Sequence, residues 1–87
     1  MGYKVVLTPH AARSFKKLEK RITTKLKPII SALADNPYPT NSKKLTGSRE
    51  HYRIRDGKYR ILYSIRKDER IVFVLEVRHR KDIYRLF

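Results

Sequence analysis

The chain contains no cysteine and no tryptophan, and acidic side chains are scarce in it. The absence of cysteine excludes disulfide bonds and thiolate metal ligands. The histidines His10, His51 and His79 lie far apart in the sequence, and no two of them have the spacing of a metal site. We therefore expect this protein to bind no metal and no other cofactor.

Long apolar runs are also missing. The longest, residues 71–77, is interrupted by Glu76 and is much shorter than the roughly 20 residues that a membrane-spanning helix needs. The first residues lead directly into a strand-like pattern, without the features of a signal peptide. These features predict a cytoplasmic protein with no membrane partner.

Positive charge is the strongest feature of the composition. Among 87 residues there are 22 Lys and Arg but 8 Asp and Glu, which gives a formal net charge of +14. Such a charge attracts polyanions and destabilises the compact state through self-repulsion. The length predicts a single domain, residues 1–87, and the hydrophobic content of 40% fits a folded chain. A nucleic acid or an acidic protein would offset the repulsion.

The N-terminal part predicts a strand followed by a helix. Residues 3–7 have a strand-like pattern. Thr8 and Pro9 then mark the start of a helix, because threonine is a favoured N-cap and proline a favoured first helical residue. We expect this helix to extend to about Lys20.

A second helix is predicted over residues 22–34, where apolar residues recur at spacings of three and four. Pro28 lies inside this stretch and lacks the N–H that a helix interior uses, so we expect either a kink or a start nearer Lys25. The two helices would form a hairpin.

Three strands are predicted in the remaining part, over residues 51–55, 59–66 and 70–79, with turns at residues 56–57 and 67–69. Residues 43–45 are expected to pair briefly with them. The apolar strand positions should pack against the helices; these are Tyr52, Ile54, Ile61, Tyr63, Ile65, Phe73, Leu75 and Val77. The predicted fold class is α+β: an N-terminal strand, a two-helix hairpin and an antiparallel meander.

Arginines recur at alternate positions of the predicted strands. Arg53 and Arg55 share one face of a strand, and Arg60 can join them from the neighbouring strand. Guanidinium groups in a row suit a phosphate-bearing partner, which makes RNA the leading candidate. Taken alone, such alternation is more often the solvated face of a half-buried sheet. An ion pair with Glu76 is the alternative role for Arg60.

Three segments, KKLTG (43–47), YRIRDGKYRILY (52–63) and VRHRKDIY (77–84), occur in the order and at the spacing of a known family. On these segments the chain resembles the RelE/ParE toxin superfamily, and in particular its RelE-type mRNA interferases. The resemblance runs through nearly the whole chain and implies a RelE-like fold. It also implies a toxin of a toxin–antitoxin pair.

The resemblance implies a ribosome-dependent endoribonuclease that cleaves mRNA in the ribosomal A site. A small acidic, RelB-like antitoxin would neutralise it by covering its basic surface. By position, the family's backbone-holding residues fall on Arg53, Arg55 and Arg60, and its arginine and tyrosine for cleavage fall on Arg80 and Tyr84. The basic residues expected to hold RNA are Arg53, Arg55, Lys58, Arg78 and Lys81.

The chemistry of these side chains limits their roles. Guanidinium groups do not lose their proton in proteins, so Arg60 and Arg80 can stabilise the scissile phosphate but cannot act as a general base. Other members of the superfamily can carry lysine where this chain has Arg53 and Arg55. Tyr84 can orient the substrate or stack on a base. His79 is a candidate for proton transfer, because histidine titrates near neutrality.

Two other functions remain open at this point. Inhibition of DNA gyrase, as in the ParE branch of the superfamily, would be binding without chemistry. A non-catalytic basic RNA-binding protein would need the positive charge but no specific arginine and tyrosine near the C-terminus.

Overall fold

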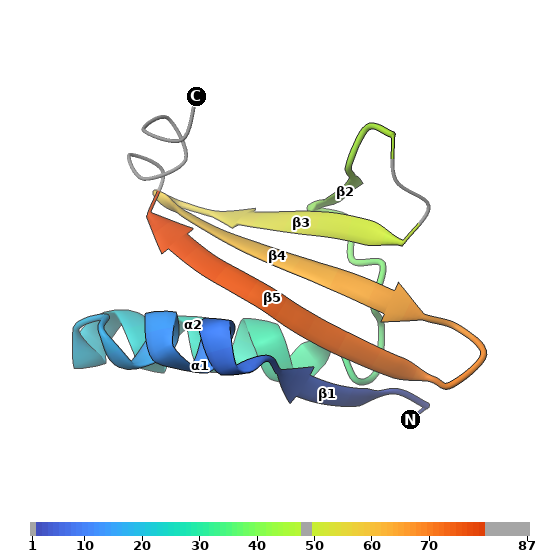
Figure 1. Ribbon diagram of the computed structural model, residues 1–87. Helices are drawn as coiled ribbons and strands as arrows, with labels where there is room; N and C mark the ends of the chain where they lie inside the picture. The colour runs from blue at the N-terminus through green and yellow to red at the C-terminus, as the bar shows by residue number, and fades with distance from the viewer. Residues whose placement is uncertain (1, 48–49, 80–87) are drawn as a thin grey trace.

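The computed structural model describes residues 2–47 and 50–79 as a five-stranded mixed sheet with two helices on one of its faces (Figure 1). The strand order is β1-β5-β4-β3-β2. Strands β3, β4 and β5 form an antiparallel meander, and β1 pairs in parallel with β5. This confirms the predicted α+β fold class. The elements are β1 (Lys4–Leu7), α1 (Pro9–Lys16), α2 (Lys20–Ala32), β2 (Ser42–Lys44), β3 (His51–Asp56), β4 (Tyr59–Arg66) and β5 (Ile71–His79).

Helix α1 begins as the sequence predicts but ends earlier. The Oγ1 of Thr8 accepts a hydrogen bond from the backbone N–H of Ala11 at 3.2 Å and caps the helix. The helix ends at Lys16 rather than at Lys20, because the N–H of Leu18 bonds to the carbonyl of Phe15 at 3.1 Å and tightens the last turn. The side chain of Leu18 then packs against the core.

Helix α2 runs through Pro28 without interruption, so the expected start near Lys25 is wrong. A proline at this position leaves the carbonyl of Thr24 without its helical donor. Both residues lie on the exposed side of the helix, where water can satisfy that carbonyl. Neither α1 nor α2 is long and apolar enough to cross a membrane.

A β-bulge between β4 and β5 decides which side chains of β5 enter the core. Leu62 pairs with Glu76, but the next residue, Tyr63, pairs with Val74, which leaves Leu75 as an extra residue. The alternation of β5 therefore reverses at this point. Val72, Val74 and Val77 face the helices and are buried. The expectation that Phe73 and Leu75 belong to this face is wrong for the same reason.

The turn between β4 and β5 is one residue longer than predicted. Arg70 has a φ of 55°, in the left-handed region, so the strand begins at Ile71 rather than at Arg70. The Nε of Arg70 donates a hydrogen bond to the carbonyl of Gly2 at 3.3 Å, and its guanidinium lies 5.5 Å from the ring centre of Tyr3. The turn is thus tied to the residues that precede β1.

Tyr63 joins the sheet to the segment that follows α2. Its ring is fully buried, and its hydroxyl donates a hydrogen bond to the carbonyl of Pro37 at 2.9 Å. The prediction that Tyr63 belongs to the core is confirmed, and Tyr59 packs against that core. Burial raises the pKa of Tyr63 to about 12, because the phenolate would lose its hydration in the core.

Replacing Tyr63 by phenylalanine should therefore have two effects. At neutral pH the variant loses about 1 kcal/mol of unfolding free energy, because the carbonyl of Pro37 loses its donor. Since the folded pKa is raised, the unfolded chain ionises first, and the Tyr63 contribution is lost as pH rises from 10 through 12. Urea unfolding across this range should show a smaller alkaline loss in Tyr63→Phe than in the wild type. Tyr3→Phe is the matched control. Equal alkaline losses of unfolding free energy in Tyr63→Phe and the wild type would contradict this account.

Candidate nucleic-acid interface

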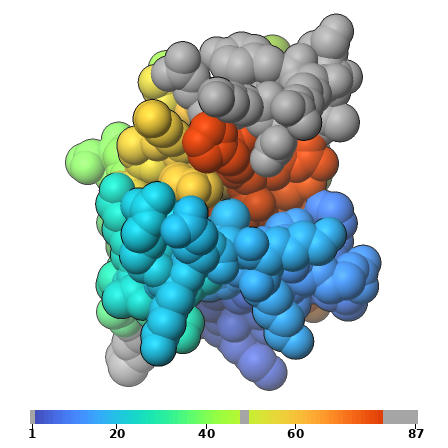
Figure 2. Space-filling model, turned by 90° about the vertical axis from the view of Figure 1, so that its left-hand side faces the viewer, coloured from blue at the N-terminus to red at the C-terminus, as the bar shows by residue number. Residues whose placement is uncertain are grey.

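The face of the sheet that points away from the helices carries two rows of aligned side chains. One row consists of Arg55, Arg60 and Arg78, which are cross-strand partners on β3, β4 and β5. The other row crosses β2 to β5 and consists of Lys43, Arg53, Leu62 and Glu76. We call these two rows the basic face. Figure 2 shows part of the surface of the β3–β5 region above the two helices.

The three arginines of this row repel one another, and the ion pair of Arg78 with Glu76 offsets part of that repulsion. Adjacent strands are about 4.8 Å apart, and like charges directly opposite each other are destabilising. The side chains cannot relieve this by losing a proton. Arg55 is exposed, whereas Arg60 and Arg78 are half-buried. A phosphate group on this row would accept paired hydrogen bonds from the guanidinium groups and reduce their repulsion.

A small hollow lies beside the basic face. It has a volume of about 280 Å³ and is lined by Thr40, Asn41, Ser42, Lys43, Arg53 and Arg55. The side-chain amide of Asn41 donates a hydrogen bond to the carbonyl of Arg55 at 3.5 Å, which holds the segment before β2 against β3. The hollow combines hydroxyl, amide and cationic groups, a set that suits an anionic ligand.

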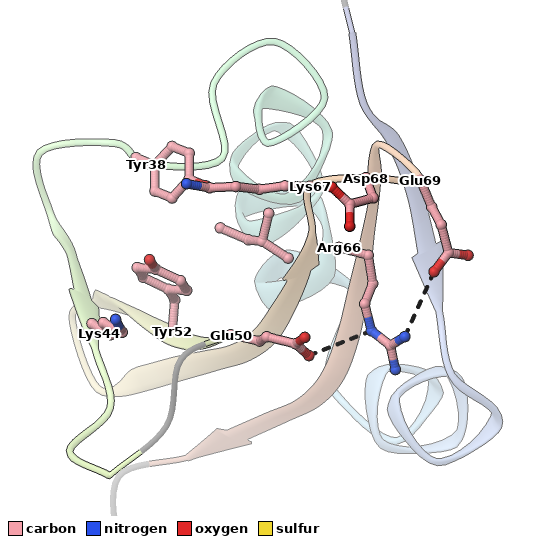
Figure 3. A pocket seen from close by; sticks show the side chains of 9 residues that line it. Tyr38, Lys44, Glu50, Tyr52, Arg66, Lys67, Asp68 and Glu69 are labelled. Carbon is pink, nitrogen blue, oxygen red and sulfur yellow. Dashed lines mark ion pairs between the residues drawn. The ribbon is translucent and has the colours of Figure 1, made fainter.

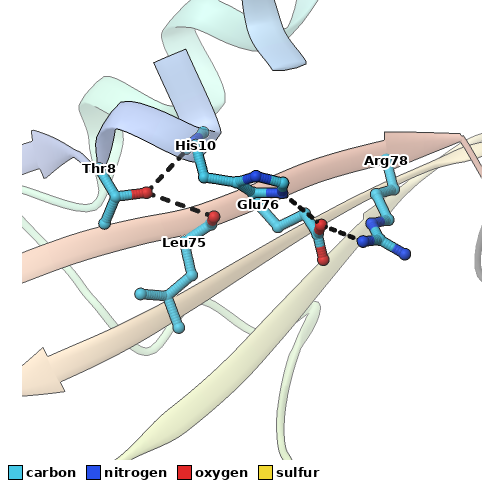
Figure 4. A network of polar contacts seen from close by, with 6 residues as sticks. Thr8, His10, Leu75, Glu76 and Arg78 are labelled. Atoms are coloured by element: carbon cyan, nitrogen blue, oxygen red, sulfur yellow. Dashed lines mark hydrogen bonds and ion pairs between the residues drawn. The ribbon is translucent and has the colours of Figure 1, made fainter. Parts of the chain in front are cut away.

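Glu76 connects the basic face to the start of α1 (Figure 4). Its Oε1 lies 2.7 Å from the Nε2 of His10 and forms an ion pair with the guanidinium of Arg78. Glu76 is 14% exposed in its side chain. The hydroxyl of Thr8 donates to the carbonyl of Leu75 at 3.4 Å and ties the cap of α1 to the same strand. Glu76 thus fixes the direction of Arg78.

The register separates His79 from the arginine row. His79 is the cross-strand partner of Tyr59. The residues next to them, Arg60 and Arg78, face away from the helices. Because side chains alternate along a strand, Tyr59 and His79 lie on the helix side of the sheet. The two rings contact edge to face, with centroids 5.1 Å apart. His79 therefore alternates with Arg78 along β5, and both residues line a hollow of about 400 Å³ together with His10 and Glu76.

The other predicted site residues are placed as follows. Lys58 lies exposed in the turn between β3 and β4, next to the basic face. Arg80, Lys81 and Tyr84 lie outside the described residues. Among residues 2–47 and 50–79, no three His, Asp or Glu side chains are grouped in a way that could hold a metal ion.

A larger cavity, of about 570 Å³, lies at the other end of the sheet (Figure 3). Its charged groups include both signs, and three of them, Arg66, Glu50 and Glu69, form ion pairs. Arg66 contacts Glu50 at 3.5 Å and Glu69 at 3.6 Å, and Lys67 lies 5.7 Å from the ring centre of Tyr38. Because its charges are balanced in this way, the cavity lacks the excess of positive charge that the basic face has.

Sequence reasoning missed three members of the site. Lys43 joins the second row through the short strand β2, whose pairing register cannot be read from composition. Glu76 was considered as a partner of Arg60, and it pairs with Arg78 and His10. Glu76 could have been recognised as a site residue, because it is a carboxylate inside an otherwise apolar strand. Nothing in the sequence linked His10 to that carboxylate.

Known proteins match this chain over most of its length. The family described as "ParE toxin of type II toxin-antitoxin system, parDE" matches residues 5–84. A candidate toxin of Methanocaldococcus jannaschii, RelE1, is 32% identical over 88 residues, which cover 98% of each protein.

Two solved complexes contain chains of the same fold. A chain of the archaeal RelE–RelB complex from Pyrococcus horikoshii OT3 has a TM-score of 0.81 and 25% identity, covering 92% of this chain and 97% of that one. A chain of the toxin–antitoxin complex RelBE2 from Mycobacterium tuberculosis has a TM-score of 0.80 and 30% identity, covering 92% and 100%. The chain belongs to the RelE/ParE superfamily of toxins of type II toxin–antitoxin systems.

Proposed function

We propose that this protein is an endoribonuclease toxin that cuts messenger RNA in the A site of the ribosome. The observation that carries the proposal is the row of Arg55, Arg60 and Arg78, which offers three adjacent guanidinium groups to one strand of phosphates. Such a row binds a nucleic-acid backbone without reading its sequence. The protein would act in the cytoplasm, where message and ribosomes are found.

The proposed reaction uses the nucleophile that RNA itself carries. The 2′-hydroxyl attacks the adjacent phosphorus, the bond to the 5′-oxygen breaks, and a 2′,3′-cyclic phosphate and a 5′-hydroxyl result. Arg60 and Arg80 stabilise the charge that develops on the phosphate oxygens. Tyr84 orients or stacks on the message, and the residues that hold the backbone are Arg53, Arg55, Lys58, Arg78 and Lys81.

Proton acceptors are scarce in this arrangement. The arginines cannot accept the proton of the 2′-hydroxyl. His79 assists the transfer of this proton, which ends on the leaving 5′-oxygen; its side chain lines a hollow of about 400 Å³ together with Arg78. The ribosome would compensate by holding the message in line for attack, since correct orientation alone lowers such barriers by several kcal/mol. This is why we propose dependence on the ribosome.

An acidic antitoxin is the second part of the proposal. The similar chains from P. horikoshii and M. tuberculosis were solved in toxin–antitoxin complexes. The net charge of +14 is a further support, because an acidic partner would reduce the self-repulsion of this chain.

Inhibition of DNA gyrase is the second candidate, because the matching family is described by the ParE toxin. One experiment separates the candidates: purified protein is added to a reconstituted translation system and to a gyrase supercoiling assay. Cuts in codon register on ribosome-bound message support the proposal. Blocked supercoiling with intact message supports gyrase inhibition, and RNA binding without either effect supports a non-catalytic protein.

Replacing Arg60 by alanine should lower the rate of mRNA cleavage by about 100-fold or more, because a donor that stabilises the transition state is lost. The matched control is Arg13→Ala, which removes one guanidinium from the exposed side of α1 and should keep the rate within about twofold. The rates are measured on ribosomes programmed with a defined message. Equal losses in both variants would mean that net charge, rather than position, matters.

Arg80→Ala and Tyr84→Phe should lower the cleavage rate while RNA affinity changes only a few-fold, because many other cations hold the backbone. Single-turnover cleavage and equilibrium RNA binding measure the two quantities separately. Wild-type rates in both variants would remove these residues from the mechanism.

Replacing Glu76 by glutamine should separate binding from cleavage. RNA binding should tighten by about fivefold at low salt, because one negative charge at contact distance is worth about 1 kcal/mol. The cleavage rate of bound RNA should fall, because Arg78 loses the carboxylate that directs it. Glu69→Gln is the matched control, since Glu69 forms an exposed ion pair with Arg66 at the far end of the sheet. Identical behaviour of the two variants would contradict a positioning role.

A further inference from the structure

The cavity of about 570 Å³ beside the turn between β4 and β5 has an aromatic wall (Figure 3). Tyr38 and Tyr52 form this wall, with their rings in edge-to-face contact and their centroids 5.5 Å apart. Tyr52 stacks in turn on the fully buried ring of Tyr63 at 5.9 Å, so the core holds the wall in place. Ile65, which is 4% exposed, adds an apolar surface. We call this feature the tyrosine cavity, after Tyr38 and Tyr52.

The wall presents an aromatic ring to solvent. Tyr38 is 39% exposed, and its backbone N–H donates a hydrogen bond to the Oδ1 of Asn36 at 3.0 Å, which fixes the segment that carries the ring. Unstacked nucleobases bind to proteins by stacking on aromatic side chains of this kind. The volume of the tyrosine cavity lies in the range of sites for small molecules.

The charged groups around the tyrosine cavity leave one carboxylate for a ligand. Three basic and three acidic side chains line the cavity, so their formal charges cancel. Arg66 occupies two of the carboxylates through its ion pairs with Glu50 and Glu69. The third, Asp68, is exposed and forms no ion pair within residues 2–47 and 50–79. A neutral group with hydrogen-bond donors and acceptors on its edges therefore suits this cavity better than an anion.

We propose that the tyrosine cavity binds a single unstacked guanine base. The face of the base would lie on the ring of Tyr38 or Tyr52. Its N1–H and its N2 amino group would donate two parallel hydrogen bonds to the carboxylate of Asp68. Its O6 and N7 would accept hydrogen bonds from the ammonium groups of Lys44 and Lys67, which line the same cavity.

The carboxylate of Asp68 argues against the other bases. Guanine alone among the four has two adjacent donors, N1–H and the N2 amino group, on its pairing edge. Adenine and cytosine place an acceptor nitrogen beside their amino group, and uracil flanks its one N–H with two carbonyl oxygens. Each of these would turn an acceptor toward the carboxylate, which only accepts hydrogen bonds.

The tyrosine cavity is separate from the basic face. Tyr52 and Ile65 alternate with residues of the opposite face of the sheet, and they lie near the ends of β3 and β4 that are remote from the arginine row. A guanine bound here is therefore not the nucleotide that is cut. The inference does not rest on the proposed function, because a free guanine nucleotide and an unpaired guanine of an RNA loop present the same edge.

Titration of the full chain with GMP and AMP tests the preference, with the ring signals of Tyr38 and Tyr52 followed by NMR. GMP should bind about fivefold or more tighter than AMP, because a bidentate pair discriminates between bases. Asp68→Asn should reduce the ratio of the two affinities to about one or below, because an asparagine amide can pair with adenine. Glu19→Gln is the matched control: it removes an exposed carboxylate outside the cavity and should keep the wild-type ratio.

A second pair of variants tests the wall. Tyr38→Ala should weaken the binding of both nucleotides about fivefold or more, because a stacking surface is lost. Tyr38→Phe keeps the ring and should bind like the wild type. Equal affinities of the wild type for GMP and AMP, an unchanged ratio in Asp68→Asn, or wild-type binding in Tyr38→Ala would overturn the proposal.

Two RNA hairpins identify the source of the base. They differ only in one loop nucleotide, guanine or adenine. Tighter binding of the guanine hairpin than of GMP, with shifts at Tyr38 and Tyr52, identifies RNA as the source, whereas tighter binding of GMP identifies a free nucleotide.

The outcome is separable from that of the proposed function. Arg60→Ala should keep the preference for GMP, because Arg60 lies on the opposite face of the sheet. A chain that prefers GMP at the tyrosine cavity but cuts no message would support the cavity and refute the nuclease. A chain that cuts message without this preference would do the reverse.

Discussion

The burial of one row of apolar side chains determines where the positive charge goes. Ile54, Ile61 and Val77 are cross-strand partners, all buried against the helices. Burying each of them contributes about 1.5–3 kcal/mol. Opposed like charges on the other face cost less than about 1 kcal/mol for each pair. The core therefore prevails, and alternation forces Arg55, Arg60 and Arg78 to the opposite face, where they form a single row.

The same alternation, interrupted by one β-bulge, separates the basic face from the face of the sheet that the helices cover. The bulge at Leu75 turns Val72 and Val74 into the core while Glu76 and Arg78 stay on the basic face. Glu76 then links that face to the cap of α1 through His10. On the other side, the helices leave an apolar groove with a lysine rim.

Much of this arrangement could be predicted from the sequence, and the misses have physical causes. The strand β4 and the shared face of Arg53 and Arg55 could be predicted, because side chains of a central strand point to alternate faces with a period of two residues. Phe73 and Leu75 were misplaced because a bulge depends on pairing between strands, which one sequence does not display. The place of Lys43 and the contact of Glu76 with His10 also depend on tertiary register. The assignment of Arg80 and Tyr84 depends on family resemblance, and both lie outside the described residues.

The central claim is that the arginine row binds the RNA backbone as one unit. The most direct measurement is NMR of the arginine guanidinium groups during titration with an RNA whose scissile 2′-hydroxyl is replaced by hydrogen, so that it cannot be cut. The account predicts that Arg55, Arg60 and Arg78 shift together with one affinity, while Arg13 on α1 does not. Shifts spread evenly over all arginines, or confined to the helical side, would contradict it.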